Sequence, residues 1–503
     1  LLRPLPYASP GQLVSLSHSV ALKGLDHVEQ SDASFLVYQR HNQVFTAMGS
    51  YRDAAVNLAP GSGNGEDAER VSTASVSASL LPMLGVAPLF GRYFAAGEDR
   101  FDAPRAIILS EGLWRKRFGA DRSIVGKRVL VDGVPSEVVG VMPLRFQFPS
   151  ATTEAWIPTP FDPAHTEPGS FNYHAVARLR DGVTPAAAAA DLDRVLPRML
   201  DEYPSDIPPA MFASVHLRAT VRPLLDVMVS DVSRLLWILF GTGVVVLLIA
   251  CANVANLFLI RGEARHRELA VRTALGAGRS AVLAQYFSEA ALLAGTGGVL
   301  GLAIAGSVIR LLAALPESMA LPRMAEVSLD GRVVAFAVAV TIATAIAVSV
   351  VPLLRARRVP LSAVLKDSGR AATSGVARQR SRNVLVVAQV ALALVLVAAS
   401  GLMLRSFSRL RSVSPGFDAE HALAMNIALP DAKYRSSSSE MQYYNALADQ
   451  IRAIPGVTAV GYTNWLPLSG ENDNGVVGVE DHPVGTNKVP PVHDQSNVSG
   501  EYF

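Results

Sequence analysis

Four long apolar stretches constrain this 503-residue chain more than any other feature of its sequence. A bilayer core about 30 Å thick takes roughly 20 apolar residues in a helix, and backbone groups in lipid must form their hydrogen bonds within that helix. Each stretch contains a run of that length without a charged side chain. Four buried helices of a large soluble protein are the alternative, but one core would hardly bury so many neighbouring apolar runs. We therefore expect four membrane-spanning helices, at residues 235–260, 283–310, 333–354 and 383–404.

Positive charge in the connecting loops indicates how these spans are oriented, because short cytoplasmic loops carry an excess of Lys and Arg. Residues 261–279 contain five Arg against two Glu, and residues 355–382 contain eight Lys or Arg against one Asp. Residues 310–332 are balanced, with three Arg and three acidic residues. We expect the first and third loops in the cytoplasm, which leaves residues 1–230 and 405–503 outside.

The outer residues 1–230 contain no run long enough to span a membrane. Short β-like stretches at 106–109, 128–131 and 137–141 alternate with turn signals, and residues 185–202 have a helical composition. This pattern predicts a mixed α/β soluble domain.

Two pairs of similar segments indicate an internal duplication. Ser9-Pro10-Gly11 resembles Ser414-Pro415-Gly416, and Val76-Ser77-Ala78 resembles Val498-Ser499-Gly500. Their shared order predicts two copies of one unit, in which a span precedes an outer domain and three further spans. The chain begins without Met at Leu1, so we expect a fragment whose second copy is truncated.

Several classes of function find no support in the residues. The net charge of +2 gives no argument for a nucleic-acid partner. Cys251 is the single cysteine, which excludes an intrachain disulfide, and the ten scattered His show no metal-ligand spacing. An ATP-binding P-loop needs Gly-Lys followed by Ser or Thr, and Gly126-Lys127-Arg128 lacks that hydroxyl. We expect no catalytic residue, metal or cofactor in this chain.

The basic stretch 261–279 predicts a short helix on the inner membrane surface. Glu268 and Arg272 stand four positions apart with the acid first, which is the favourable order for a helical ion pair, and Gly276 can end the helix. Here the chain resembles the FtsX/MacB-like permease family of bacterial ABC transporters, whose R-E-x-x-x-R-x-A-L-G-A pattern is followed by Q-x-x-x-E-A. The matching residues are Arg267, Glu268, Arg272, Ala274, Leu275, Gly276 and Ala277, then Gln285, Glu289 and Ala290.

The outer region is similar to the MacB-like periplasmic core domain through residues 113–119, 124–126 and 139–149. The two-copy layout is similar to the duplicated permeases found in acidobacteria. The resemblance implies a polytopic α-helical protein of the bacterial inner membrane with mixed α/β periplasmic core domains. The implied divisions are a core domain at 1–230, a three-span permease domain at 231–354 with the cytoplasmic helix 261–279, a linker at 355–382, a span at 383–404 and a truncated second core domain at 405–503.

The resemblance also implies a non-catalytic permease subunit. In this family the cytoplasmic helix docks on a partner ATPase, which binds ATP and magnesium and drives motion of the periplasmic domain for export or mechanotransmission. Besides the ATPase, the expected partners are membrane lipid and a periplasmic adaptor or outer-membrane component. Two alternatives remain open, namely a basic helix that merely anchors the topology and a membrane-anchored sensor or scaffold without transport.

Small and polar residues within the spans have a packing interpretation. Gly297 and Gly301 form a G-x-x-x-G that lets helices approach closely, either within the chain or between copies. Asn253 and Asn256 are expected to form hydrogen bonds between helices rather than to contact a substrate. No acidic or basic residue lies at the middle of a span, which argues against a proton- or sodium-driven carrier.

Overall fold

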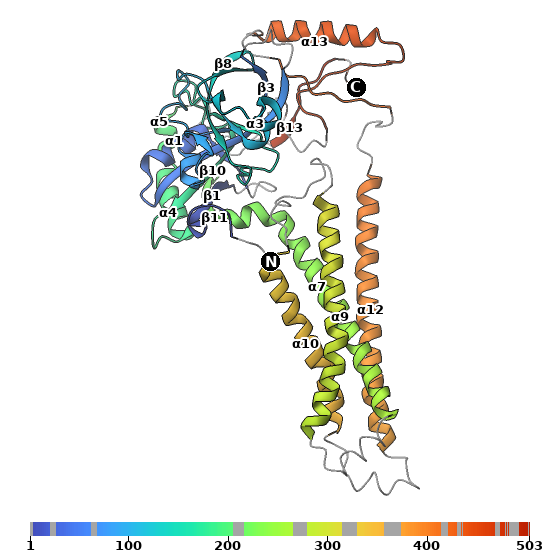
Figure 1. The fold of residues 1–503 in the computed structure, drawn as a ribbon. Helices are drawn as coiled ribbons and strands as arrows, with labels where there is room; N and C mark the ends of the chain where they lie inside the picture. Colours follow the sequence, from blue (N-terminus) through green and yellow to red (C-terminus); the bar gives the residue numbers. More distant parts are fainter. Residues whose placement is uncertain are drawn as a thin grey trace. The chain divides into compact units, whose positions relative to one another are not determined.

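The computed structural model describes residues 4–20, 27–61, 68–204, 216–264, 279–313, 329–356, 374–413, 421–429, 434, 436–467, 473–477, 479, 481, 492–500 and 502. These residues form two compact units (Figure 1). The first unit combines Leu1–Ser230 with Pro415–Phe503, and the second is Asp231–Ser414.

A mixed β-sheet forms the centre of the first unit. Its strands are β1 (Leu13–Ser19), β2 (Gln30–Ser31), β3 (Phe45–Pro60), β4 (Glu69–Val76), β5 (Phe90–Gly91), β6 (Ala106–Ser110), β7 (Arg128–Val131), β8 (Val134–Met142), β9 (Ala155–Pro158), β10 (Phe171–Leu179) and β11 (Arg218–Pro223). Its main path among the described residues is β11-β1-β10-β3-β4-β9-β6-β8-β5. The pairs β4–β9 and β6–β8 are parallel, and the other pairs along this path are antiparallel.

The long strand β3 joins two lobes of this sheet. Its first part pairs with β10, its later part with β4, and its last residues with β7. Because one continuous strand runs through both lobes, neither lobe can rotate freely about the other without breaking ladder hydrogen bonds.

The first lobe packs helices α1 (Asp32–His41), α4 (Pro185–Val195) and α5 (Arg198–Glu202) against the sheet. Ser31 caps α1 with a capping box, and Thr184 caps α4 immediately before Pro185. Phe35 and Leu192 are fully buried in this core. The predicted helical stretch 185–202 therefore consists of two helices. Helix α4 ends before Leu196, and α5 begins after Pro197.

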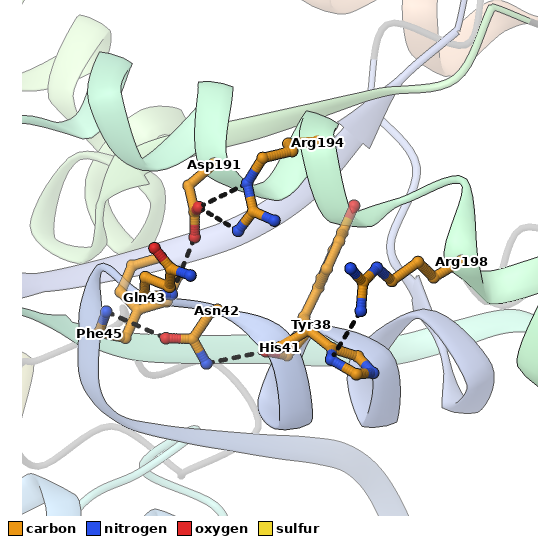
Figure 2. A network of polar contacts seen from close by, with 8 residues as sticks. All are labelled: Tyr38, His41, Asn42, Gln43, Phe45, Asp191, Arg194 and Arg198. Atoms are coloured by element: carbon orange, nitrogen blue, oxygen red, sulfur yellow. Dashed lines mark hydrogen bonds and ion pairs between the residues drawn. The ribbon is translucent and has the colours of Figure 1, made fainter.

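A polar network fixes the end of α1 to α4 and α5 (Figure 2). The Asp191 carboxylate accepts the Gln43 backbone N–H at 2.9 Å and also pairs with Arg194. Arg198 donates to Nδ1 of His41 at 3.2 Å. These bonds tie the turn between α1 and β3 to the two helices that cover the same lobe.

The second lobe contains α2 (Leu80–Leu84), α3 (Glu111–Phe118) and the strands β4 to β9. Trp156 is fully buried, and its indole N–H donates to the Phe148 carbonyl at 2.8 Å. The predicted strands at 106–109, 128–131 and 137–141 are present as β6, β7 and part of β8. Short 3₁₀ helices η1 (Pro10–Gln12) and η2 (Arg122–Ile124) complete the described elements of residues 4–204.

Long apolar helices make up the second unit. They are α7 (Leu224–Ala264, whose first turns belong to the first unit), α9 (Arg279–Ala313), α10 (Gly331–Ala356) and α12 (Ser374–Ser412). Each contains one predicted span. Among the described residues, three stretches are long and apolar enough to cross a membrane, namely Leu236–Leu257, Phe287–Leu312 and Val386–Ser412. In α10 the apolar stretch, Gly331–Ala347, is shorter, so the fourth span stays a prediction.

The C-terminal segment of the first unit repeats local arrangements of its N-terminal part. It contains α13 (Ser437–Arg452), β12 (Asp473–Val476) and β13 (Val492–Gln495). Ser436 caps α13 with a capping box whose third helical residue is Ser, as Ser31 does for α1. These two helices therefore begin with the same local arrangement, as the predicted duplication would require.

Two backbone contacts in the N-terminal and C-terminal segments also correspond. In the N-terminal segment Ser77 N–H donates to Ser50 O at 2.9 Å, and Ser50 N–H donates to Ser77 Oγ at 2.9 Å. In the C-terminal segment Ser499 N–H donates to Tyr462 O at 2.9 Å, and Tyr462 N–H donates to Ser499 Oγ at 3.1 Å. The Val76-Ser77 and Val498-Ser499 similarity thus reflects one backbone arrangement that occurs twice.

Candidate coupling site

The residues predicted to dock on a partner lie mostly outside the described residues. This applies to Arg267, Glu268, Arg272, Ala274, Leu275, Gly276 and Ala277. Glu289 is described in α9, where it is half-buried next to the buried Ala290. The described residues instead show how the outer domain is connected to the first span and how the apolar helices pack.

The last strand of the sheet continues directly into a membrane helix. β11 pairs antiparallel with β1 from Arg218 opposite Ser19 to Pro223 opposite Val14. Helix α7 begins at the next residue, Leu224. Proline is tolerated at Pro223 because β11 is the edge strand of the sheet, and Asp226 in the first helical turn suits the positive end of the helix dipole.

The first turns of α7 are part of the core of the outer domain. Leu224 is 2% exposed and belongs to the cluster around Trp156, and Leu225 and Met228 pack against that cluster. Val229 is also buried. Because no loop separates these anchored residues from the span that begins at Leu236, a displacement of the helix start must shift core side chains.

The neighbouring strand β1 is held by a buried histidine. The Nδ1 atom of His18 lies 2.9 Å from Glu29 O, to which it donates, and Nε2 lies 3.0 Å from the Tyr38 hydroxyl, from which it accepts. Burial lowers the pKa of His18 to about 4, so the imidazole is neutral at pH 7. The strand that pairs with β11 is thereby fixed to α1 through an uncharged network.

Small residues bring α7 and α9 together in the second unit. Ala290 of α9 is 3% exposed and packs with Cys251 and Val254 of α7. Ala255 of α7 is buried as well. Small side chains allow helix backbones to approach closely in membranes, where no hydrophobic force drives association. The contact lies one residue from Glu289, the described member of the predicted docking set.

The contact between α9 and α10 uses a different glycine from those predicted. A Cβ on Gly298 would lie 2.7 Å from Oγ1 of Thr341, whereas a Cβ on Gly297 or Gly301 would have nothing within 4 Å among the described residues. Successive helical residues point about 100° apart, so Gly298 faces α10 and Gly297 does not. The proposed packing role of Gly297 and Gly301 stays a prediction, and nothing in the described part of this chain fills their face.

Two buried polar atoms in the apolar helices lack a hydrogen-bond partner among the described residues. They are Oδ1 of Asn256 in α7 and Nε2 of Gln389 in α12. The interhelical bond expected for Asn256 is therefore not formed by its oxygen within the described part. Within the same residues, no group of three or more His, Cys, Asp or Glu could hold a metal ion.

The mixed α/β domain and the apolar helices that follow it define a membrane permease with an outer folded domain. Residues 10–195 match the MacB-like periplasmic core domain, and residues 240–361 match the FtsX-like permease C-terminal domain. Together these matches identify the chain as an FtsX/MacB-like ABC permease. The resemblance predicted from its sequence is confirmed.

Curated relatives of this chain are fused proteins according to their names. The macrolide export ATP-binding/permease protein MacB of Burkholderia cenocepacia (strain HI2424) is 28% identical over 203 residues, which are 40% of this chain and 28% of that protein. The protein of the same name from Marinobacter nauticus (strain ATCC 700491 / DSM 11845 / VT8) is 28% identical over 47% of this chain and 35% of its own length. The match with this chain thus covers about a third of each relative.

Solved structures also align with part of this chain. A domain of a putative permease protein from Porphyromonas gingivalis has a TM-score of 0.34 at 19% identity. The alignment covers 43% of this chain and 93% of the solved chain. The periplasmic region of MacB from Actinobacillus actinomycetemcomitans has a TM-score of 0.30 at 12% identity. That alignment covers 44% of this chain and 93% of the solved chain.

Proposed function

We propose that this chain is the non-catalytic permease subunit of an ABC complex, in which ATP hydrolysis by a partner moves the outer domain. The observation that carries the proposal is the junction between β11 and α7. The strand ends at Pro223, the helix begins at Leu224, and the first helical turns are buried in the outer core. A continuous helix without a linker can pass a displacement from the span to the sheet.

The ATP site belongs to the partner in this proposal. The 503 residues contain no Gly-Lys-Ser or Gly-Lys-Thr, so the lysine and hydroxyl that a P-loop brings to phosphate and magnesium are not found here. The curated relatives are named as ATP-binding and permease proteins in one chain. We assign ATP and magnesium to a separate ATPase that contacts the cytoplasmic stretch 261–279.

The proposed arrangement places the chain in the bacterial inner membrane with its outer domains in the periplasm. It retains the divisions 1–230, 231–354, 355–382, 383–404 and 405–503. Almost none of the side chains of the three apolar stretches is buried in the structure, which suits contact with lipid tails. A periplasmic adaptor or outer-membrane component is a further proposed partner. The outcome of the motion is export of a small hydrophobic compound, peptide or lipoprotein, or mechanical signalling alone.

Reconstitution of the full-length protein with a partner ABC ATPase tests the coupling. We expect the wild-type chain to stimulate ATP turnover in liposomes, and the double variant E268A/R272A to lower it about tenfold, within the range of typical allosteric couplings. The double variant R310A/R332A, in the loop predicted outside, is the control and should turn over ATP normally. Intact complex formation and turnover in E268A/R272A would show that the docking assignment is wrong. An ATPase that the wild-type chain does not stimulate would favour the sensor or scaffold alternative.

A flexible insertion tests the mechanical link itself. Three glycines after Ser230 leave the buried residues of α7 in place and interrupt the helix before Leu236. We expect ATP turnover to persist while ATP-dependent changes in hydrogen exchange of β1 and β11 disappear. The same insertion after Gly182, in an exposed turn, is the matched control and should leave those changes intact. Persistent ATP-dependent changes after the Ser230 insertion would contradict the proposed path through α7.

A further inference from the structure

A hydrogen bond joins residues of the first unit that are far apart in the chain. Nδ2 of Asn57, on β3, donates to the carbonyl of Ala428 at 3.1 Å. The backbone of Asn57 is already occupied, because its N–H donates to Asp132 Oδ1 at 2.8 Å and its carbonyl accepts the Asp132 N–H at 2.9 Å. The side-chain amide is therefore the group that reaches the C-terminal segment.

A second hydrogen bond lies next to the first. The Tyr444 hydroxyl of α13 donates to Ile427 O at 3.4 Å, and the next carbonyl along the chain accepts from Asn57. Residues 427 and 428 are therefore bonded to α13 on one side and to β3 on the other.

The C-terminal side of the contact is held by aromatic packing. Tyr444 stacks on Tyr462 with ring centroids 5.5 Å apart and meets Tyr443 edge-on at 5.9 Å. Exposure also falls toward the contact, since Leu423 is 91% and Met425 is 57% exposed whereas residues 427–429 are half-buried. The partial burial of residues 427–429 indicates a specific contact.

We propose that Asn57 of β3 is a docking site for residues 427–428 of the C-terminal segment, so that the two outer segments of the chain act as one body. The side-chain amide supplies a donor for a backbone carbonyl. The occupant is this chain's own C-terminal segment. The inference is independent of ATP coupling, because it concerns only contacts within the outer unit.

Cysteine cross-linking of the full-length chain in detergent tests this docking. In a Cys251→Ala background, Asn57→Cys with Ala428→Cys should form an intramolecular link with a short bifunctional thiol reagent, identified by mass spectrometry of the joined peptides. The control pair is Arg180→Cys with Ala428→Cys, because Arg180 bonds to Val44 at the opposite end of β3 from Asn57. Absence of the link while both cysteines label singly, or links only between two copies, would overturn the proposal.

A labelling rate provides a second test that does not depend on cross-linking geometry. We expect the thiol of Ala428→Cys to react about fivefold faster when Asn57→Ala removes the side-chain donor and leaves the backbone bonds to Asp132. Asp53→Ala, on an exposed position of the same strand, is the control and should not change the rate. Equal rates in the Asn57→Ala and Asp53→Ala chains would refute docking through Asn57.

Discussion

His18 is buried on β1, and its two ring nitrogens are both engaged, one donating to Glu29 O and the other accepting from Tyr38. Burial favours the neutral ring. A proton on Nε2 would make the Tyr38 hydroxyl turn from donor to acceptor and would place a charge in a desolvated core. The strand next to β11 therefore depends on the protonation state of one side chain.

The pH dependence of stability follows from this burial. The pKa of His18 is about 4 in the fold, against 6.5 for an unperturbed histidine. Below pH 6.5 this histidine binds a proton in the unfolded chain but stays neutral in the folded chain. The free energy of unfolding therefore falls as the pH drops from about 6.5 to about 4, by about 3 kcal/mol in total. Urea unfolding of the detergent-purified chain, followed by tryptophan fluorescence, to which the buried Trp156 contributes, measures this change.

A variant separates His18 from the other titrating groups. His18→Gln should be less stable than wild type at pH 7, and its unfolding free energy should change less between pH 6.5 and 4. His165→Gln, at an exposed position paired with Asp162, should keep the wild-type slope. An identical slope in His18→Gln and wild type would rule out His18 as the source of the pH dependence.

At the scale of elements, the structure distinguishes glycines that the sequence leaves equivalent. Gly298 faces Thr341 of α10, and Thr341 is held by a hydrogen bond from its hydroxyl to Ala337 O at 2.8 Å. Gly297 and Gly301 have open space around them in the described part of the chain. The G-x-x-x-G pattern therefore marks one face of α9, while the contact with α10 uses another.

Matched substitutions test which glycine packs within the chain. Gly298→Val should weaken the contact between α9 and α10 and destabilise the helical unit by about 1–3 kcal/mol, the usual cost of overpacking. Gly297→Val has the same effect on helix propensity and should cost less than half as much in the monomeric chain. Thermal unfolding in detergent, with the oligomeric state checked by light scattering, measures both variants. Equal losses of stability in the two variants would contradict the orientation of α9 in which Gly298 faces α10.

At the scale of the whole molecule, the four-span topology depends on α10. Its apolar stretch among the described residues, Gly331–Ala347, is shorter than those of the other long helices, yet α10 itself extends to Ala356. Orientation predicted from loop charge requires α10 to cross, because the basic segments 261–279 and 355–382 must both lie in the cytoplasm.

Thiol labelling of whole cells and inverted vesicles measures this topology. In a Cys251→Ala background, a cysteine at residue 270 or 370 should react only in inverted vesicles, and one at residue 101 or 441 only from outside. Labelling of residues 270 and 370 from opposite sides would show that α10 does not cross the membrane. Labelling of residue 270 from outside would reverse the predicted orientation.

The sequence alone determined the class of this protein. Hydropathy is a property of neighbouring residues, so apolar runs predict membrane helices without knowledge of how the helices pack. The periplasmic and permease sequence patterns together predict the family. The strands at 106–109 and 128–131 were predictable for the same reason, since alternation and turn residues are properties of adjacent positions.

Only the tertiary structure decided which residues meet. The contact of Asn57 with Ala428 joins positions 371 apart, and no local pattern predicts such a pair. The choice of Gly298 over Gly297 depends on the rotation of α9 about its axis, which the packing against α10 sets. The anchoring of Leu224 in the outer core likewise requires the sheet to be assembled, because burial is a property of the folded neighbourhood rather than of the residue.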